Sequence, residues 1–199
     1  AMNYALAEYG CPVHTAEKCR FMIGDGLRTF ASRALPADKQ NLVDDVMQKM
    51  KEYYTPRCME QTRPYDGIVS VVTALRKKNI KLAVVTNKNH EMAVKILGGL
   101  FPADSFDYIL GSRAGESIKP QTDTTLGALA KMNVKTDECV FVGDSAVDVQ
   151  TAKNCGMKFV GVSWGLRGRE ELQTAGAEII IDQPEELLGV IVTEGLDTS

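Results

Sequence analysis

Two short motifs place polar side chains with the chemistry of anion binding after apolar stretches of the chain. Thr86-Asn87 follows an apolar run, and Lys119-Pro120 comes after the next run along the chain. A hydroxyl, an amide and the backbone N–H groups at a helix start can donate hydrogen bonds to an anion, and a lysine held extended by the following proline can act as a point charge toward phosphate. Taken singly, Thr86 could instead cap a helix, and Lys119 could be a solvated surface lysine.

An acidic pair follows a third apolar run. Gly143-Asp144 ends that run, and Asp148 comes four residues after Asp144. This spacing predicts Asp144 at the tip of a strand and Asp148 in the first turn of the next helix, so that both carboxylates can point at one site. Hard oxygen ligands in this setting suit Mg²⁺ better than zinc. For Asp144 alone, the alternative is a helix N-cap.

The elements that must position these motifs alternate between strand and helix from residue 62 onward. Strands are expected at 81–86, 106–110, 139–142, 159–162 and 178–181. Helices are expected at 68–78, at 90–97 with Gly98-Gly99 as its end, and at 122–132, 147–155 and 184–192. Continuous apolar runs are typical of parallel strands covered on both faces. The pattern predicts a doubly wound, mostly parallel Rossmann-like α/β sheet that binds ligands at the carboxyl ends of its strands.

The first 62 residues have a different character, and their pattern predicts a small helical bundle. Apolar residues recur at helical spacing over 42–50, with charged residues between them. Gly24-Asp25-Gly26 interrupts this stretch, and by itself a motif of this kind indicates a plain turn. Residues 1–9 read as the interior of a helix, with neither a cap nor a preceding strand. We therefore expect the 199 residues to belong to a longer polypeptide.

Composition argues against several classes of protein. The net charge is −3 and the pI is about 5.5, so no broad basic field exists to hold a nucleic acid. No apolar run approaches the roughly 18 residues of a membrane span and no signal peptide is visible, which predicts a cytoplasmic protein without a membrane partner. The five cysteines lack C-x-x-C spacing and are expected to be free thiols. Two histidines leave little material for a Ser-His-Asp triad or a zinc site.

The order of hydroxyl, Lys-Pro and Gly-Asp-x-x-x-Asp resembles the haloacid dehalogenase-like (HAD) hydrolase superfamily. The second, third and fourth motifs of that superfamily match 84–88, Lys119-Pro120 and 141–148. Residues 1–62 resemble the inserted helical cap domain of the phosphoglycolate phosphatase-like branch, with 1–8 as the end of the lead-in helix, and 63–199 resemble its Rossmann-like core. The substrate-specificity loop of that cap is matched by Gly24, Asp25, Gly26 and Leu27.

This resemblance implies a Mg²⁺-dependent phosphatase that hydrolyses a small phosphomonoester, such as phosphoglycolate, through an aspartyl-phosphate. Thr86 and Asn87 would bind phosphate, and Lys119 would stabilise charge in the transition state. Asp144 and Asp148 would hold Mg²⁺, with orientation of Lys119 as the alternative role for Asp148. The implied partner is a small phosphorylated metabolite, and the oligomeric state stays open.

The superfamily's first motif, Asp-x-Asp-Gly-Thr, which supplies the nucleophile, occurs nowhere in the sequence. By the resemblance, its strand lies in the middle of the sheet, between the strands ending at Thr86 and Val142. We expect roughly 15–25 residues upstream of Ala1 to carry this central first strand, and we expect residues 1–199 alone to be inactive.

Three alternatives remain open from the sequence. A phosphomutase of the same superfamily would share every core residue named above. A phosphonatase would need a Schiff-base lysine in the cap, where Lys18, Lys39 and Lys49 stand in no such motif. A truncated or non-catalytic phosphate-binding module, including a genuine pseudoenzyme, would need no nucleophile at all.

Overall fold

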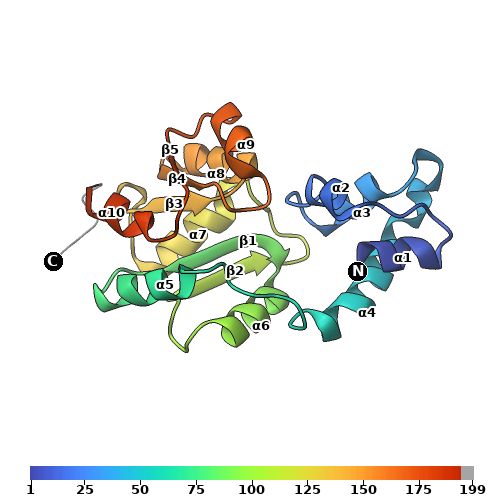
Figure 1. The fold of residues 1–199 in the computed structure, drawn as a ribbon, viewed down its shortest axis with the longest axis horizontal. Coiled ribbons are helices and arrows are strands. Elements are labelled where there is room, and N and C mark those ends of the chain that lie inside the picture. The colour runs from blue at the N-terminus through green and yellow to red at the C-terminus, as the bar shows by residue number, and fades with distance from the viewer. Residues whose placement is uncertain (194–199) are drawn as a thin grey trace. The chain divides into compact units, whose positions relative to one another are not determined.

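The computed structural model describes residues 1–193 and divides into two compact units (Figure 1). The first unit spans Ala1–Thr62 and the second spans Arg63–Ser199. Each unit has its own buried apolar cluster. No helix in the described part of the chain is both long and apolar enough to cross a membrane.

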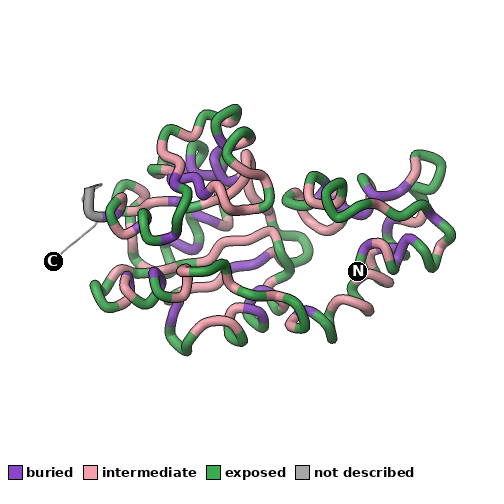
Figure 2. The backbone as a smooth tube through the Cα atoms, viewed as in Figure 1, coloured by how far each residue is buried: buried purple, intermediate pink, exposed green. Residues whose placement is uncertain are grey.

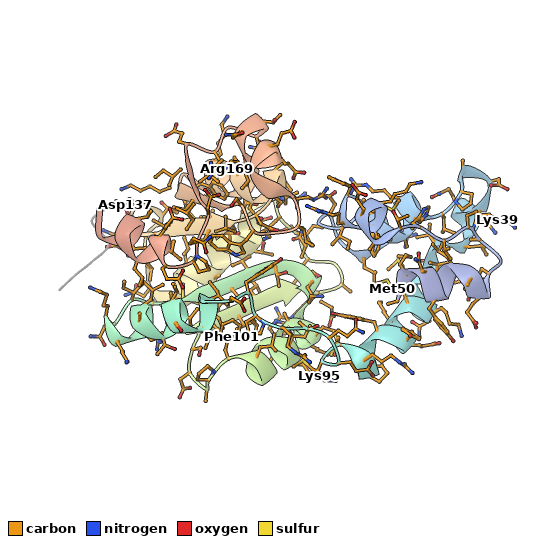
Figure 3. The ribbon with its side chains drawn as sticks, viewed as in Figure 1. Lys39, Met50, Lys95, Phe101, Asp137 and Arg169 are labelled. Atoms are coloured by element: carbon orange, nitrogen blue, oxygen red, sulfur yellow. The ribbon has the colours of Figure 1, made fainter. Side chains whose placement is uncertain are left out.

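The first unit is built from helices alone within its described residues. In chain order they are α1 (Met2–Glu8), α2 (Ala16–Arg20), α3 (Leu27–Ala34), the 3₁₀ turn η1 (Ala37–Leu42) and α4 (Val43–Arg57). Leu6, Phe30 and Val46 bring α1, α3 and α4 into one buried cluster, and Met50, labelled in Figure 3, packs against it. The core of this unit therefore comes from the helical periodicity expected from the sequence.

The described residues of the second unit form five parallel strands in two sheets. The first sheet pairs β1 (Ala83–Asn89) with β2 (Tyr108–Ser112). The second has the order β3 (Val140–Gly143), β4 (Lys158–Val162) and β5 (Ile179–Ile181). This arrangement confirms the predicted α/β class with parallel strands.

Six α-helices of the second unit are described, and five of them match predicted helices. They are α5 (Ile68–Lys77), α6 (His90–Leu100), α7 (Thr122–Met132), α8 (Ala146–Cys155), α9 (Gly168–Thr174) and α10 (Glu186–Thr193), with the 3₁₀ turn η2 (Thr136–Glu138) between α7 and β3. The helix α9 was not predicted. Its seven residues hold one buried apolar side chain, Leu172, so a helical stripe is hardly visible in the sequence.

The predicted end of α6 was wrong. The helix runs through Gly98 and Gly99 and ends at Leu100, because Phe101 is already extended with φ −120° and ψ 153°. Pro102 follows Phe101, and a residue before proline is pushed out of helical geometry. The Phe101 ring, labelled in Figure 3, then packs edge-on against Phe106 with ring centroids 5.1 Å apart. Proline, and not the glycine pair, ends this helix.

The apolar strands are not all covered on both faces, contrary to the expectation from their sequence. Val84 and Val85 of β1 are only half-buried, and Val142 of β3 is 40% exposed (Figure 2). Within the described residues, β1 pairs only with β2, and β3 pairs only with β4. One edge of each strand therefore keeps backbone groups that no strand of residues 1–193 satisfies.

Candidate active site

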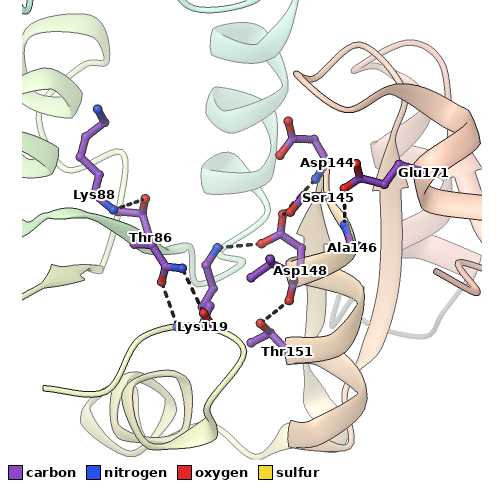
Figure 4. A network of polar contacts seen from close by, with 11 residues as sticks. Thr86, Lys88, Lys119, Asp144, Ser145, Ala146, Asp148, Thr151 and Glu171 are labelled. Carbon is purple, nitrogen blue, oxygen red and sulfur yellow. Dashed lines mark hydrogen bonds and ion pairs between the residues drawn. The ribbon is translucent and has the colours of Figure 1, made fainter. Parts of the chain in front are cut away.

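Lys119 of the third motif and Asp148 of the fourth form a buried ion pair in the second unit (Figure 4). The Lys119 ammonium nitrogen Nζ lies 2.7 Å from Oδ1 of Asp148, and the two side chains are 13% and 8% exposed. Nζ also lies 5.5 Å from the ring centroid of Phe141. Lys119 is therefore no solvated surface lysine, and its charge is held in place at the ends of the strands.

Asn87 fixes the backbone of Lys119. Its Oδ1 accepts a hydrogen bond from the Lys119 N–H at 2.8 Å, and its Nδ2 donates to the Lys119 carbonyl at 3.0 Å. A side-chain amide that makes both bonds to one residue holds that residue in register with β1. The amide of Asn87 thus positions Lys119, which leaves backbone N–H groups as the candidate phosphate donors at this position.

Thr86 does not cap the following helix. The cap of α6 is Asn89, whose side chain accepts the N–H of Met92 at 3.2 Å. The Thr86 hydroxyl accepts the N–H of Lys88 at 3.1 Å. A hydroxyl that accepts one hydrogen bond still carries a proton to donate, so Thr86 retains the donor that phosphate binding requires.

Asp148 is engaged on both carboxylate oxygens. While Oδ1 meets Lys119, Oδ2 accepts the Ser145 hydroxyl at 2.7 Å and the Asp144 N–H at 3.2 Å. Gly143 permits this packing, because a Cβ at that position would lie 2.3 Å from the Asp148 Cβ. These bonds favour orientation of Lys119, the alternative role that the sequence left open for Asp148.

Asp144 is half-buried and lies in the turn that leads into α8. The N-cap of α8 is Ser145, so the capping alternative for Asp144 is wrong. Its Oδ2 accepts the backbone N–H of Leu166 at 2.7 Å. Burial raises the pKa of Asp144 and the Asp148 charge raises it further, while the Leu166 N–H and Lys119 oppose the rise. A carboxylate desolvated in this way gains from a nearby cation.

The donor set at this turn fits Mg²⁺, with few protein ligands. No group of three or more His, Cys, Asp or Glu residues gathers among the residues that the structure describes. Mg²⁺ is usually held by one or two carboxylates together with water and substrate phosphate, so a single well-placed carboxylate is compatible with it. Asp144 is the better candidate for direct contact, because the oxygens of Asp148 already serve Lys119 and the turn.

The predicted specificity loop, Gly24, Asp25, Gly26 and Leu27, belongs to the first unit, whereas the other predicted site residues belong to the second. Gly24 and Gly26 have φ angles of +128° and +87°, which favour glycine. Asp25 forms an ion pair with Arg33 of α3, and Gly26 is the residue at which α3 starts. The positive φ angles of Gly24 and Gly26 thus define a loop that leads directly into α3.

The sequence prediction missed two groups from the β4–α9 segment that hold the acidic turn, residues 144–146. The Leu166 N–H donates to Asp144, and Oε1 of Glu171 accepts the N–H of Ala146 at 3.0 Å. A backbone N–H has no sequence signature. Glu170-Glu171 after Gly168 did carry a signal, since acidic residues favour the first turn of a helix.

The model of the haloacid dehalogenase-like hydrolase family matches residues 1–162, so the chain belongs to that family. The phosphoglycolate phosphatase of Caulobacter vibrioides is 28% identical over 186 residues, covering 91% of this chain and 78% of the relative. The N-acetylmuramic acid 6-phosphate phosphatase of Pseudomonas aeruginosa is 27% identical over 188 residues, covering 93% and 83%.

A solved structure from Lactobacillus delbrueckii subsp. bulgaricus, provisionally assigned as a phosphoglycolate phosphatase, has a TM-score of 0.88 and 32% identity. The match covers 100% of this chain and 90% of the chain in that structure. Family membership, together with relatives that are phosphatases by name, supports a hydrolase that acts on phosphate esters.

Proposed function

We propose that this chain provides the phosphate- and metal-binding half of a Mg²⁺-dependent phosphatase that hydrolyses a small phosphomonoester through an aspartyl-phosphate. One observation carries the proposal: Lys119 is anchored by Asp148 at 2.7 Å and by Asn87 on its backbone, beside the desolvated carboxylate of Asp144. A fixed cation next to a metal-ligating carboxylate is an arrangement suited to a phosphate dianion and the charge that moves during its transfer.

Lys119 and Thr86 would bind and polarise the phosphoryl group. The Thr86 hydroxyl donates to a phosphate oxygen, and the Lys119 ammonium balances negative charge on the others. Because Asn87 and Asp148 already hold Lys119, little reorganisation is needed as charge develops. Asp148 keeps the lysine in place through this step.

Asp144 would hold Mg²⁺ at the start of α8. The bound ion supplies neutralisation of negative charge, so that a carboxylate nucleophile and a phosphate can approach one another. The Leu166 N–H keeps Oδ2 of Asp144 in a fixed direction. The carboxylate is thus oriented before a ligand arrives.

In this proposal the attacking carboxylate comes from outside residues 1–199, since no Asp-x-Asp-Gly-Thr string occurs within them. The single-sided pairing of β1 and β3 leaves edges at which an additional strand could bring it in. The carboxylate attacks phosphorus and the bond from phosphorus to the ester oxygen breaks. The leaving oxygen takes a proton from water and departs as the alcohol. Water then cleaves the acyl phosphate and releases inorganic phosphate.

The substrate we propose is a small metabolite of the phosphoglycolate type, selected by the loop from Gly24 to Leu27. Similarity does not separate this from a sugar phosphate, because the two relatives named above are 28% and 27% identical. The leaving group therefore has to be identified by assay.

The test uses the protein expressed from its complete coding sequence, with residues 1–199 alone as the comparison. We expect the complete protein to release phosphate from phosphoglycolate or another small phosphomonoester, to lose this activity with EDTA and to regain it with Mg²⁺. We expect residues 1–199 alone to release none. Mass spectrometry of the quenched complete protein should detect a phosphorylated aspartate.

Two results would overturn the proposal. The first is absence of Mg²⁺-dependent phosphate release across a panel that includes phosphoglycolate, N-acetylmuramic acid 6-phosphate and p-nitrophenyl phosphate. The second is full activity in Asp144→Asn. Isomerised sugar phosphate in place of free phosphate would favour the mutase alternative instead.

A further inference from the structure

The loop after β4 and the helix α9 hold the acidic turn at two points, and the proposed mechanism uses only one of them, the Leu166 N–H. The N–H of Leu166 donates to Oδ2 of Asp144 at 2.7 Å. Five residues further along the chain, in α9, Oε1 of Glu171 accepts the N–H of Ala146 at 3.0 Å (Figure 4). Residues 25 positions apart in the sequence are thereby joined at the turn that carries Asp144.

Glu171 does at α8 what a local cap normally does. The first N–H groups of a helix lack partners within it, and the N-cap residue usually satisfies one of them. Ser145 occupies the N-cap of α8, but its side chain makes no capping bond and its hydroxyl donates to Asp148. Glu171 satisfies the N–H of Ala146 from another element, and a carboxylate at a helix N-terminus is also favoured by the helix dipole.

Glu171 is itself anchored. Its Oε2 lies 3.7 Å from Nη1 of Arg167, whose side chain is only 13% exposed. The next residue, Leu172, is fully buried and fixes α9 in the second unit. The carboxylate therefore joins α9, which is anchored by the buried Leu172, to the acidic turn.

Gly165 adds a steric constraint on the same carboxylate. A Cβ at this position would lie 2.2 Å from the Cβ of Asp144 and 2.3 Å from its Oδ2. Real Cβ atoms do not approach so closely, so any side chain at 165 would displace the Asp144 carboxyl group. Glycine at 165 therefore leaves the room that the Asp144 carboxyl group needs in its observed position.

We propose that Glu171 and Gly165 are positioning residues that set the direction of the Asp144 carboxylate and thereby the affinity of the site for a divalent cation. The inference rests on the proposed function only in taking Asp144 as the cation ligand. Groups that orient a metal ligand typically change metal affinity about 10–100-fold when they are removed. Both residues act on the turn of Asp144 and have no part in the proposed phosphate contacts, so they are positioning residues and not catalytic residues.

The test measures cation binding directly, with Mn²⁺ as the probe and electron paramagnetic resonance to count free Mn²⁺ over the complete protein. Glu171→Ala should weaken Mn²⁺ binding about 10-fold, and Gly165→Ala should weaken it by a similar factor. Glu171→Gln should stay close to wild type, since its side-chain carbonyl can still accept the Ala146 N–H. The matched control is Glu170→Ala, which removes an exposed carboxylate one residue away and should leave Mn²⁺ binding unchanged.

The outcomes separate this inference from the proposed function. Loss of Mn²⁺ binding in Asp144→Asn, with wild-type binding in Glu171→Ala and Gly165→Ala, overturns the positioning role and leaves the phosphatase proposal standing. Equal weakening in Glu170→Ala and Glu171→Ala also overturns it, because a general charge effect would then suffice. If wild-type protein hydrolyses phosphomonoesters with Mg²⁺ but Asp144→Asn binds Mn²⁺ as tightly as wild type does, the cation lies elsewhere. That result removes the basis of the inference.

A loss of fold is distinguished by amide hydrogen exchange. If Glu171→Ala acts only on the turn, exchange should rise at residues 144–146 and stay unchanged in β4 and β5. Increased exchange throughout the second unit would show general destabilisation, and then weaker Mn²⁺ binding would not support positioning. The Gly165→Ala variant keeps the Glu171 contacts, and it tests the same inference by an independent route.

Discussion

The charged groups at the strand ends of the second unit and those around the Gly24–Leu27 loop of the first unit are held in different ways. Lys119 and Asp148 are nearly buried, at 13% and 8% exposure, and the Asp148 carboxylate makes several bonds. Around the loop, Arg28 and Asp44 pair at 66% and 75% exposure. Buried pairs keep their geometry, whereas exposed pairs are screened by solvent and contribute little. The difference shows that the charged groups of the proposed chemistry are held in buried contacts, whereas the Arg28–Asp44 pair beside the proposed specificity loop lies in solvent.

The strongest way to break this comparison is to remove Lys119. In Lys119→Ala, Asp148 stays buried without its cation, so unfolding free energy should fall by roughly 3–5 kcal/mol and phosphatase activity should vanish. Denaturant titration and phosphate release measure the two effects. Lys131→Ala, at an exposed lysine of α7, is the control and should change stability by no more than about 0.5 kcal/mol. Similar small effects at both lysines would show that the ion pair is not the rigid element.

Asn87 tests whether backbone anchoring matters beyond the ion pair. Asn87→Ala removes both hydrogen bonds to Lys119 and should cost about 1–3 kcal/mol. In the proposed mechanism Lys119 stabilises the transition state, so we expect a larger effect on kcat than on KM. Asn154→Ala is a matched control, since Asn154 donates to the Pro120 carbonyl of the same segment at 2.9 Å but from an exposed position. Equal losses of kcat in the two variants would contradict a special role for Asn87.

The loop in the first unit should respond mainly in selectivity. Gly26 has φ +87° and ψ 164°, a region open essentially to glycine alone, so Gly26→Ala should destabilise by about 1–3 kcal/mol. We expect KM values for competing phosphomonoesters to change more than kcat. Gly98→Ala is the control, because Gly98 lies in α6 with open space around its Cβ position and should become slightly more stable. A fall in kcat at constant KM in Gly26→Ala would place the loop with the chemistry.

The smallest effect is expected from pH at the exposed pair. The hydrogen bond from Arg28 lowers the pKa of Asp44 in the folded chain. A depressed folded pKa gives stability that is present above the unfolded pKa and is lost as pH falls through the folded value. Asp44→Asn should therefore be slightly less stable than wild type at neutral pH and equal to it in acid, as followed by thermal unfolding across the acid range. A constant difference at all pH values would show that Asp44 acts through packing and not through charge.

Much of the fold follows from the sequence because its signals are local. Thr122–Met132 was predicted with the bounds that α7 has, and Gly156 ends α8 with φ +67° as expected of a glycine cap. The predicted strand at 81–86 appears as β1, shifted to Ala83–Asn89. The strand shift moved the helix cap from Thr86 to Asn89, which local patterns could not resolve.

The residue types and spacing of the motifs by themselves determined the candidate chemistry: a hydroxyl, a lysine and two carboxylates at the ends of parallel strands. Only the tertiary structure decided which partner each group has. Asp148 binds Lys119, and Asp144 accepts the Leu166 N–H. Glu171 accepts the N–H of Ala146 in the same turn. The physical reason is distance along the chain. The spacing of apolar residues predicts local secondary structure. A hydrogen bond between segments more than 20 residues apart forms only after the chain has packed.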